Sequence, residues 1–129
     1  MLFATDCNVA TTFKRRLRSV RPVLDMRVYD SRARRRRFRM RQADDSLREA
    51  TILRDADAQR GAVNRACYAM FYALLALLAT KQLGTSRHSG TISLFDREFV
   101  KTGVFAPDLS KALHLAFGRR QIHGYFAVN

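Results

Sequence analysis

The sequence predicts an all-α protein, an up-and-down four-helix bundle preceded by a basic, largely irregular N-terminal extension. Three observations support this fold class. From Met40 onward, apolar residues recur at helical spacing. No segment alternates polar and apolar residues with period two. The chain contains no Trp, two Pro and six Gly, a composition that argues against a loop-rich or all-β domain. Its length of 129 residues is sufficient for one domain.

The extension, residues 1–39, differs from the rest of the chain in its charge and in its lack of a helical period. Residues 1–41 carry thirteen Arg or Lys against three Asp, most of the net charge of +13. Such a block is typical of a solvated, disordered arm, or of an arm that binds RNA or DNA phosphates. A misplaced start is a further alternative, because Met40 directly precedes the first clean helical pattern. We therefore expect the helical domain over residues 40–129.

Four helices are expected in this domain. The first is amphipathic, and the second is apolar nearly all round, so that it must be covered by its neighbours and is the central element. Gly84 is expected to end the second helix in a left-handed cap, Gly103 the third, and Gly124 the fourth. The expected bounds are residues 42–55, residues 61–83, a third helix from the capping positions 85–89 to residue 103, and residues 107–122.

The longest apolar run covers residues 66–79, fourteen positions. A helix that crosses a bilayer needs about 20 apolar residues, so no membrane protein is predicted. Residues 1–10 lack the features of a secretory signal, and Cys7 and Cys67 do not form a disulfide framework. We therefore expect a cytoplasmic protein.

No metal or cofactor site is predicted. The three histidines, His88, His114 and His123, are not spaced as ligand pairs, and there is no Cys-x-x-Cys. There is also no glycine-rich phosphate loop. His88 is expected to make local hydrogen bonds in a loop that enters the third helix.

A polar pair, Asn64 and Arg65, interrupts the apolar helix near its start. Arg65, Tyr68 and Tyr72 fall at i, i+3 and i+7 and share one face. A guanidinium in apolar surroundings needs a partner or water. Arg65 therefore either reaches solvent at the helix start or forms, with Asn64 and Tyr68, a site for a phosphate or a stacked base.

A second polar group lies near the end of the chain, where Arg119 and His123 are at i, i+4 on one helix face. A neutral imidazole could take the proton from a ribose 2′-hydroxyl, and a guanidinium could stabilise the phosphorane-like transition state. These groups would suffice for RNA cleavage without a metal ion. Alternatively, basic residues in a last turn simply complement the helix dipole.

Two segments resemble the HEPN family (higher eukaryotes and prokaryotes nucleotide-binding). They are residues 62–72, AVNRACYAMFY, and residues 86–103, SRHSGTISLFDREFVKTG. The similarity covers about residues 42–121 and is to a prokaryotic subgroup whose genes often neighbour minimal nucleotidyltransferases. It implies a bundle of four or five helices, commonly a homodimer. Many HEPN proteins are metal-independent ribonucleases, and several are toxins neutralised by a nucleotidyltransferase antitoxin.

The resemblance also implies roles for residues near the C-terminus. In the toxin group, an Arg followed by four to six residues and a His forms the active site, and a Tyr two residues later accepts AMP from the antitoxin. His123 and Tyr125 match the His-x-Tyr part, whereas three residues separate Arg119 from His123 and two separate Arg120 from it. Arg119 or Arg120 with His123 would be catalytic, and Tyr125 the modification acceptor. Family members usually add another helix, so the C-terminal helix is expected to be missing or divergent.

Two functional hypotheses of different class follow. The first is a HEPN ribonuclease toxin that uses Arg119 or Arg120 with His123 on RNA and is controlled by a nucleotidyltransferase partner. The second is a non-catalytic module that binds a nucleotide or such a partner through Asn64 and its neighbours Arg65 and Tyr68. A third possibility is a fragment whose extended N-terminus and short C-terminus prevent stable folding.

Overall fold

In the computed structural model, the described backbone covers residues 10–15 and 26–125, and the described side chains are those of residues 10–15 and 31–120. Within these ranges the chain is helical, with no strand, so the prediction of an all-α fold is confirmed. A short helical turn covers residues 10–15. The other elements are α2 (Met26–Asp55), α3 (Gln59–Ala79), α4 (His88–Phe95), the π-helical segment η1 (Asp96–Val100) and α5 (Pro107–Tyr125).

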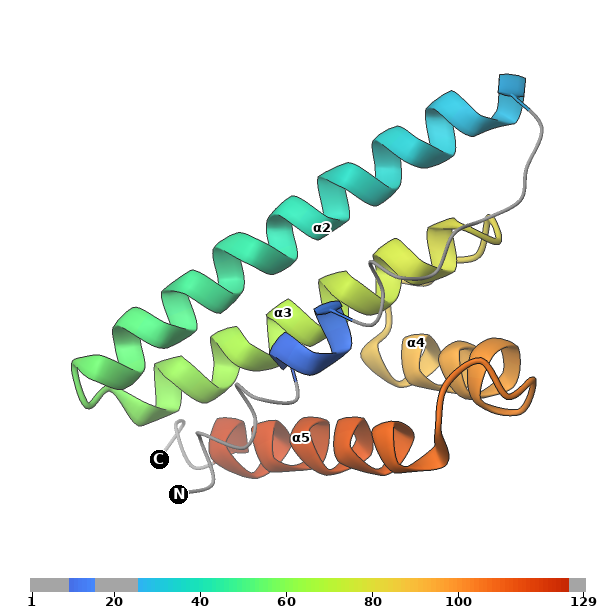
Figure 1. Ribbon diagram of the computed structural model, residues 1–129. Helices are drawn as coiled ribbons and strands as arrows, with labels where there is room; N and C mark the ends of the chain where they lie inside the picture. The colour runs from blue at the N-terminus through green and yellow to red at the C-terminus, as the bar shows by residue number, and fades with distance from the viewer. Residues whose placement is uncertain (1–9, 16–25, 126–129) are drawn as a thin grey trace.

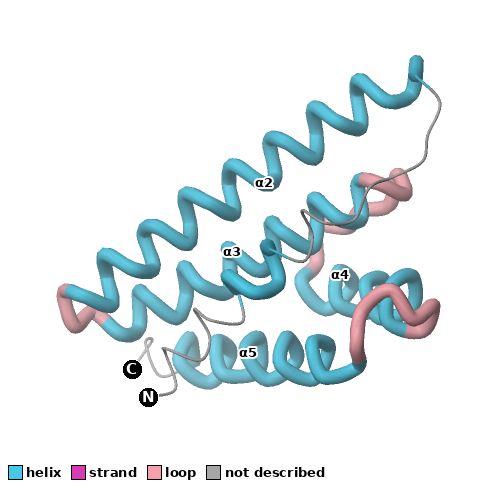
Figure 2. The backbone as a smooth tube through the Cα atoms, in the orientation of Figure 1, coloured by secondary structure: helices cyan, strands magenta, loops and turns pink. Residues whose placement is uncertain are grey.

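Helix α3 lies at the centre of the bundle, as its apolar sequence predicts. Figure 1 shows α2 packed along one side of α3, and α4 and α5 along the other. Consecutive long helices run in opposite directions, and loops connect them (Figure 2). The connection between α2 and α3 is short because Asp57 adopts a left-handed conformation, with φ of 58°.

The core is built around α3, of which thirteen residues are buried. Small side chains such as Ala66, Ala73 and Ala76 are almost fully buried and let neighbouring helices approach closely. By length and composition α3 would be apolar enough to cross a membrane, but 72% of its apolar window is buried inside the protein. Its apolarity is therefore accounted for by packing within the bundle.

A cluster of phenylalanines closes the core at the end of the bundle that carries η1. Phe95 is fully buried, and its ring centre lies 5.5 Å from that of Phe13 in an edge-to-face contact. Phe105 completes the cluster, and its ring centre lies 5.6 Å from that of Phe95 and 6.0 Å from that of Phe13. Because Phe13 belongs to the N-terminal extension, part of that extension is core rather than a solvated arm.

The structure differs from the expected irregular backbone over the part of the extension that leads into the first helix. Helix α2 begins at Met26, whereas the sequence pattern places its start at residue 42. The pattern failed because residues 26–39 carry almost no apolar stripe. Arginine is nevertheless among the stronger helix formers, and extending a helix already docked on a core costs little compared with nucleating one.

Two helix ends also differ from the prediction. Helix α3 ends at Ala79, and the left-handed residue that follows is Gln82, with φ of 58°, rather than Gly84. Helix α5 continues past Ile122 and includes Gly124 in its last turn. Gly103 does adopt the left-handed conformation expected after the third helix, with φ of 80°.

Candidate functional site

The side chain of Arg120, on α5, lies against α3 and the first turn of α4. Its Nε donates a hydrogen bond of 3.0 Å to Asn64 Oδ1, and its Nη2 donates one of 3.2 Å to the Tyr68 hydroxyl. The guanidinium carbon is 4.6 Å from the centre of the Tyr68 ring, a cation–π contact. The guanidinium is thereby held in one orientation from two sides.

The remaining guanidinium nitrogen of Arg120, Nη1, points to His88, the first residue of α4. Arg120 Nη1 lies 3.2 Å from His88 Nε2 and 3.4 Å from Nδ1. The imidazole packs face to face on Phe71, with ring centres 4.0 Å apart, and it contacts Phe117 edge to face at 5.6 Å. Because a guanidinium only donates hydrogen bonds, a ring nitrogen of His88 can bond to it only as an acceptor, the role that a neutral imidazole provides.

Burial lowers the pKa of His88 below its ordinary value of 6.5, and the positive charge of Arg120 lowers it further. Near pH 7 the site therefore contains one fixed cation and one neutral imidazole. A neutral imidazole at this pH can accept a proton, and the adjacent cation can hold an anion.

The stability of the protein should fall in acid because of His88. The unfolded state takes up a proton near pH 6.5, whereas folded His88 resists it until a lower pH, so unfolding becomes easier as pH falls below about 6.5. Thermal unfolding from about pH 8 to about pH 5 should show a loss of Tm that is smaller in His88→Gln than in the wild type. An identical pH dependence in both proteins would contradict the buried, neutral imidazole.

Arg65 lies beside this site, but its charge is partnered. Its Nε is 2.9 Å from Glu49 Oε2, and its guanidinium carbon is 5.9 Å from the Tyr68 ring centre. Arg120, in contrast, contacts neutral groups only among the described residues: an amide, a phenol and an imidazole. Of the two cations, Arg120 is therefore the one whose charge is left for an external anion.

The structure brings together three of the residues predicted from the sequence, Asn64, Tyr68 and Arg120. The predicted shared face of Arg65, Tyr68 and Tyr72 is present, since the Tyr68 ring lies 5.9 Å from the Arg65 guanidinium carbon and stacks on Tyr72 at 6.0 Å. Arg119 occupies the neighbouring position on α5 and is half-buried. The sequence prediction did not include His88, because it treated this residue as part of a loop with local contacts.

Two predicted residues are described only through their backbone. His123 and Tyr125 belong to the last turn of α5, and their side chains lie outside the described residues. In the part of the chain that the structure describes, no group of three or more His, Cys, Asp or Glu is placed to hold a metal ion.

The chain is similar in sequence to known proteins over the region that carries this site. The HEPN domain model matches residues 37–128. A UPF0332 protein of Thermotoga maritima is 41% identical over 85 residues, 66% of this chain and 64% of that protein. "Putative toxin MJ0142" of Methanocaldococcus jannaschii is 35% identical over 86 residues, 67% of this chain and 58% of that protein. A Gloeobacter violaceus UPF0332 protein is 36% identical over 90 residues, 70% of this chain and 71% of that protein.

The chain thus spans about three fifths of the length of the first two relatives. No solved structure matches the chain at a significant level. The matched region contains α3, α4 and α5, the three elements that carry Asn64, Tyr68, His88 and Arg120.

Proposed function

Because the chain belongs to the HEPN domain family, we propose that it is the toxin half of a HEPN/nucleotidyltransferase module and cleaves RNA without a metal ion. The family match over residues 37–128 and the toxin name of a Methanocaldococcus jannaschii relative support a toxin-like module. The finer assignment as a ribonuclease is supported by the chemistry of the site around Arg120, and the nucleotidyltransferase partner is implied by the resemblance to the toxin group.

The observation that carries the proposal is the orientation of Arg120. Asn64, Tyr68 and His88 each engage a different nitrogen of its guanidinium, and none of them neutralises its charge. A phosphate that approaches this group meets a cation whose orientation is already fixed, so little reorganisation is needed when negative charge develops in the transition state. A backbone phosphate of RNA is the ligand that this arrangement suits.

The remaining chemistry needs a group that accepts a proton. A neutral imidazole removes the proton of the ribose 2′-hydroxyl, and the oxygen attacks the adjacent phosphorus. A 2′,3′-cyclic phosphate forms, the bond to the 5′-oxygen breaks, and that oxygen takes up a proton. His123 is assigned as the base, since it lies three residues after Arg120 on a continuous helix and therefore on a neighbouring part of its surface. His88 is assigned as a positioning residue for Arg120.

The partner is assigned from the resemblance to the toxin group, in which the Tyr of the His-x-Tyr pattern, here Tyr125, accepts AMP. A nucleotidyltransferase would transfer AMP from ATP to this hydroxyl, forming a phosphodiester and releasing pyrophosphate. Tyr125 lies two residues after His123 in the last turn of α5, so a bulky anionic AMP there would obstruct the approach of RNA. Assembly as a homodimer in the cytoplasm belongs to the same proposal.

The test of this function is cleavage of RNA by the purified protein in excess EDTA. We expect fragments that end in 2′,3′-cyclic phosphate and begin with a 5′-hydroxyl, at a rate unchanged by added Mg²⁺. An RNA in which every 2′-hydroxyl is methylated should remain intact, because the attacking oxygen is blocked. Absence of cleavage by a protein of full helix content, or a strict need for metal, would refute the ribonuclease.

The second candidate function is a non-catalytic module that binds a nucleotide, and one observation favours it. Tyr68 and Tyr72 are stacked next to Arg120, so the same site offers a ring for a base and a cation for a phosphate. Such a module would bind AMP or ATP without cleaving RNA. Its affinity would fall in Tyr68→Ala and would not change in His123→Ala.

A further inference from the structure

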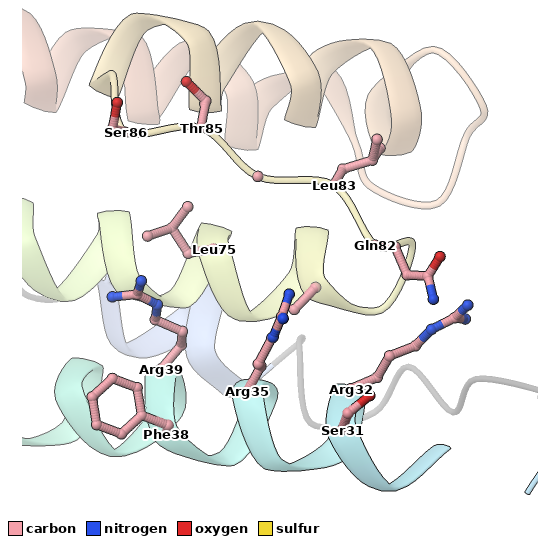
Figure 3. A pocket seen from close by; sticks show the side chains of 12 residues that line it. Ser31, Arg32, Arg35, Phe38, Arg39, Leu75, Gln82, Leu83, Thr85 and Ser86 are labelled. Atoms are coloured by element: carbon pink, nitrogen blue, oxygen red, sulfur yellow. The ribbon is translucent and has the colours of Figure 1, made fainter. Parts of the chain in front are cut away.

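A cavity lies away from Arg120, between the N-terminal half of α2 and the segment that follows α3. Its volume is about 710 Å³. Figure 3 shows that arginine side chains of α2 form one wall, and that residues after α3 form the opposite wall. The lining includes Arg32, Arg35, Phe38 and Arg39 from α2, and Gln82, Leu83, Thr85 and Ser86 from the segment after α3. We call this cavity the α2 groove.

The charge of the α2 groove comes from Arg32, Arg35 and Arg39, which are spaced i, i+3 and i+7 and share one helix face. Their guanidinium groups extend toward α3 and residues 82–86 (Figure 3). None of the three takes part in an ion pair within the described part of the chain. The Nε of Arg32 is buried and has no hydrogen-bond partner there. A buried donor without a partner is costly.

The other lining groups fit a nucleic-acid strand rather than a small anion alone. The hydroxyls of Thr85 and Ser86 can bind phosphate oxygens, and Phe38, which is 57% exposed, offers a ring on which a base can stack. Arg32 and Arg39 are seven residues apart, about 10 Å along a helix, so the row of cations is longer than one phosphate. Aromatic rings along a row of cations are typical of sites for single strands.

A series of side-chain contacts connects the lining of the α2 groove to the Arg120 site. The guanidinium carbon of Arg39 is 5.9 Å from the ring centre of Tyr72. Tyr72 stacks on Tyr68 at 6.0 Å, and Tyr68 in turn contacts Arg120 at 4.6 Å. On the opposite wall, Ser86 lies two residues before His88. A strand bound along the α2 groove would therefore lead toward the site proposed for cleavage.

We propose that the α2 groove binds the phosphate backbone of single-stranded RNA whose next nucleotides reach Arg120. The anion-binding groove follows from the arginines and the cavity, and only the identity of the strand as RNA rests on the proposed function. Arg34, Arg37 and Arg41 provide a matched comparison, since they have the same i, i+3, i+7 spacing on α2, are exposed, and do not line the cavity.

The experiment compares two triple variants of equal charge. One is Arg32→Gln with Arg35→Gln and Arg39→Gln, and the other is Arg34→Gln with Arg37→Gln and Arg41→Gln. Each is titrated, in EDTA, with a labelled 2′-O-methyl RNA of about 12 nucleotides, a length in the range that single-strand sites cover. Because this RNA cannot be cleaved by 2′-hydroxyl attack, binding is measured whether or not the protein is a ribonuclease.

We expect the groove variant to bind at least about tenfold more weakly than the matched variant. The slope of log K against log salt should also become less steep by about 2, since each phosphate contact on a single strand contributes about 0.7. Circular dichroism confirms that both variants keep their helices. Equal losses of RNA affinity in the two variants would show nonspecific electrostatic attraction and would overturn the proposal. Failure of the wild-type protein to bind the RNA would also overturn it. Groove-dependent binding without any cleavage of unmodified RNA would uphold the α2 groove and refute the ribonuclease.

Discussion

Arg120→Ala is expected to lower the rate of RNA cleavage by about 10²–10³-fold, the loss typical of removing one oriented donor from a transition-state site. The structure gives the reason. Arg120 is held by Asn64, Tyr68 and His88 with its charge left uncompensated, so its removal takes away both the cation and its orientation. The measurement is single-turnover cleavage with protein in excess, which separates the chemical step from product release.

Two further substitutions distinguish charge from geometry at this position. Arg120→Lys keeps the charge but cannot make three divergent hydrogen bonds, so its activity should lie between those of the wild type and the alanine variant. Asn64→Asp leaves Arg120 in place and sets a carboxylate 3.0 Å from its Nε, so the anion site should be occupied internally and cleavage should fall steeply. Arg48→Ala, an exposed position on α2, is the matched control. Full activity of both Arg120 variants would exclude Arg120 from the site.

The features that could be predicted from the sequence are those that depend on one helix at a time. The apolar circumference of α3 identified the central helix, because only a helix covered on all sides can lack a polar face. The same local geometry placed Arg65, Tyr68 and Tyr72 on one helix face, and in the structure Tyr68 contacts both Arg65 and Tyr72. The resemblance to the HEPN family, carried by residues 62–72 and 86–103, is confirmed by the family match.

The features that could not be predicted depend on how helices meet. His88 and Arg120 are 32 residues apart and come together only because α4 and α5 pack on the same side of α3. Similarly, the sequence alone does not distinguish Arg65 from Arg120 as a candidate for an unpaired cation. In the structure, Arg65 forms an ion pair with Glu49 of α2. The helix over residues 26–39 was missed because hydrophobic periodicity is the main sequence signal for a helix, and a run of arginines has none.

His123→Ala is expected to have an effect at least as large as that of Arg120→Ala, a loss of about 10²–10⁴-fold in the rate of cleavage, as for removal of a general base. Helix α5 is unbroken through Tyr125, so His123 follows Arg120 by three residues, and the Cβ atoms of such neighbours are about 5–6 Å apart. That separation lets one residue hold a phosphate while the other reaches the adjacent 2′-hydroxyl. Affinity for uncleavable RNA should be unchanged, because the alanine removes a proton acceptor and leaves the cations.

The comparison with His88 determines which imidazole is the base. If His88 positions Arg120, then His88→Asn, which can still accept a hydrogen bond from the guanidinium, should restore much of the activity lost in His88→Ala, whereas His123→Asn should stay inactive. His114→Ala, an exposed histidine paired with Asp96, is the matched control and should cleave at the wild-type rate. If instead His123→Ala retains full activity and both His88 variants are inactive, the proton acceptor is His88. Its lowered pKa, due to burial and Arg120, would then place the acid limb of the pH–rate profile of the free enzyme below the ordinary histidine value of 6.5.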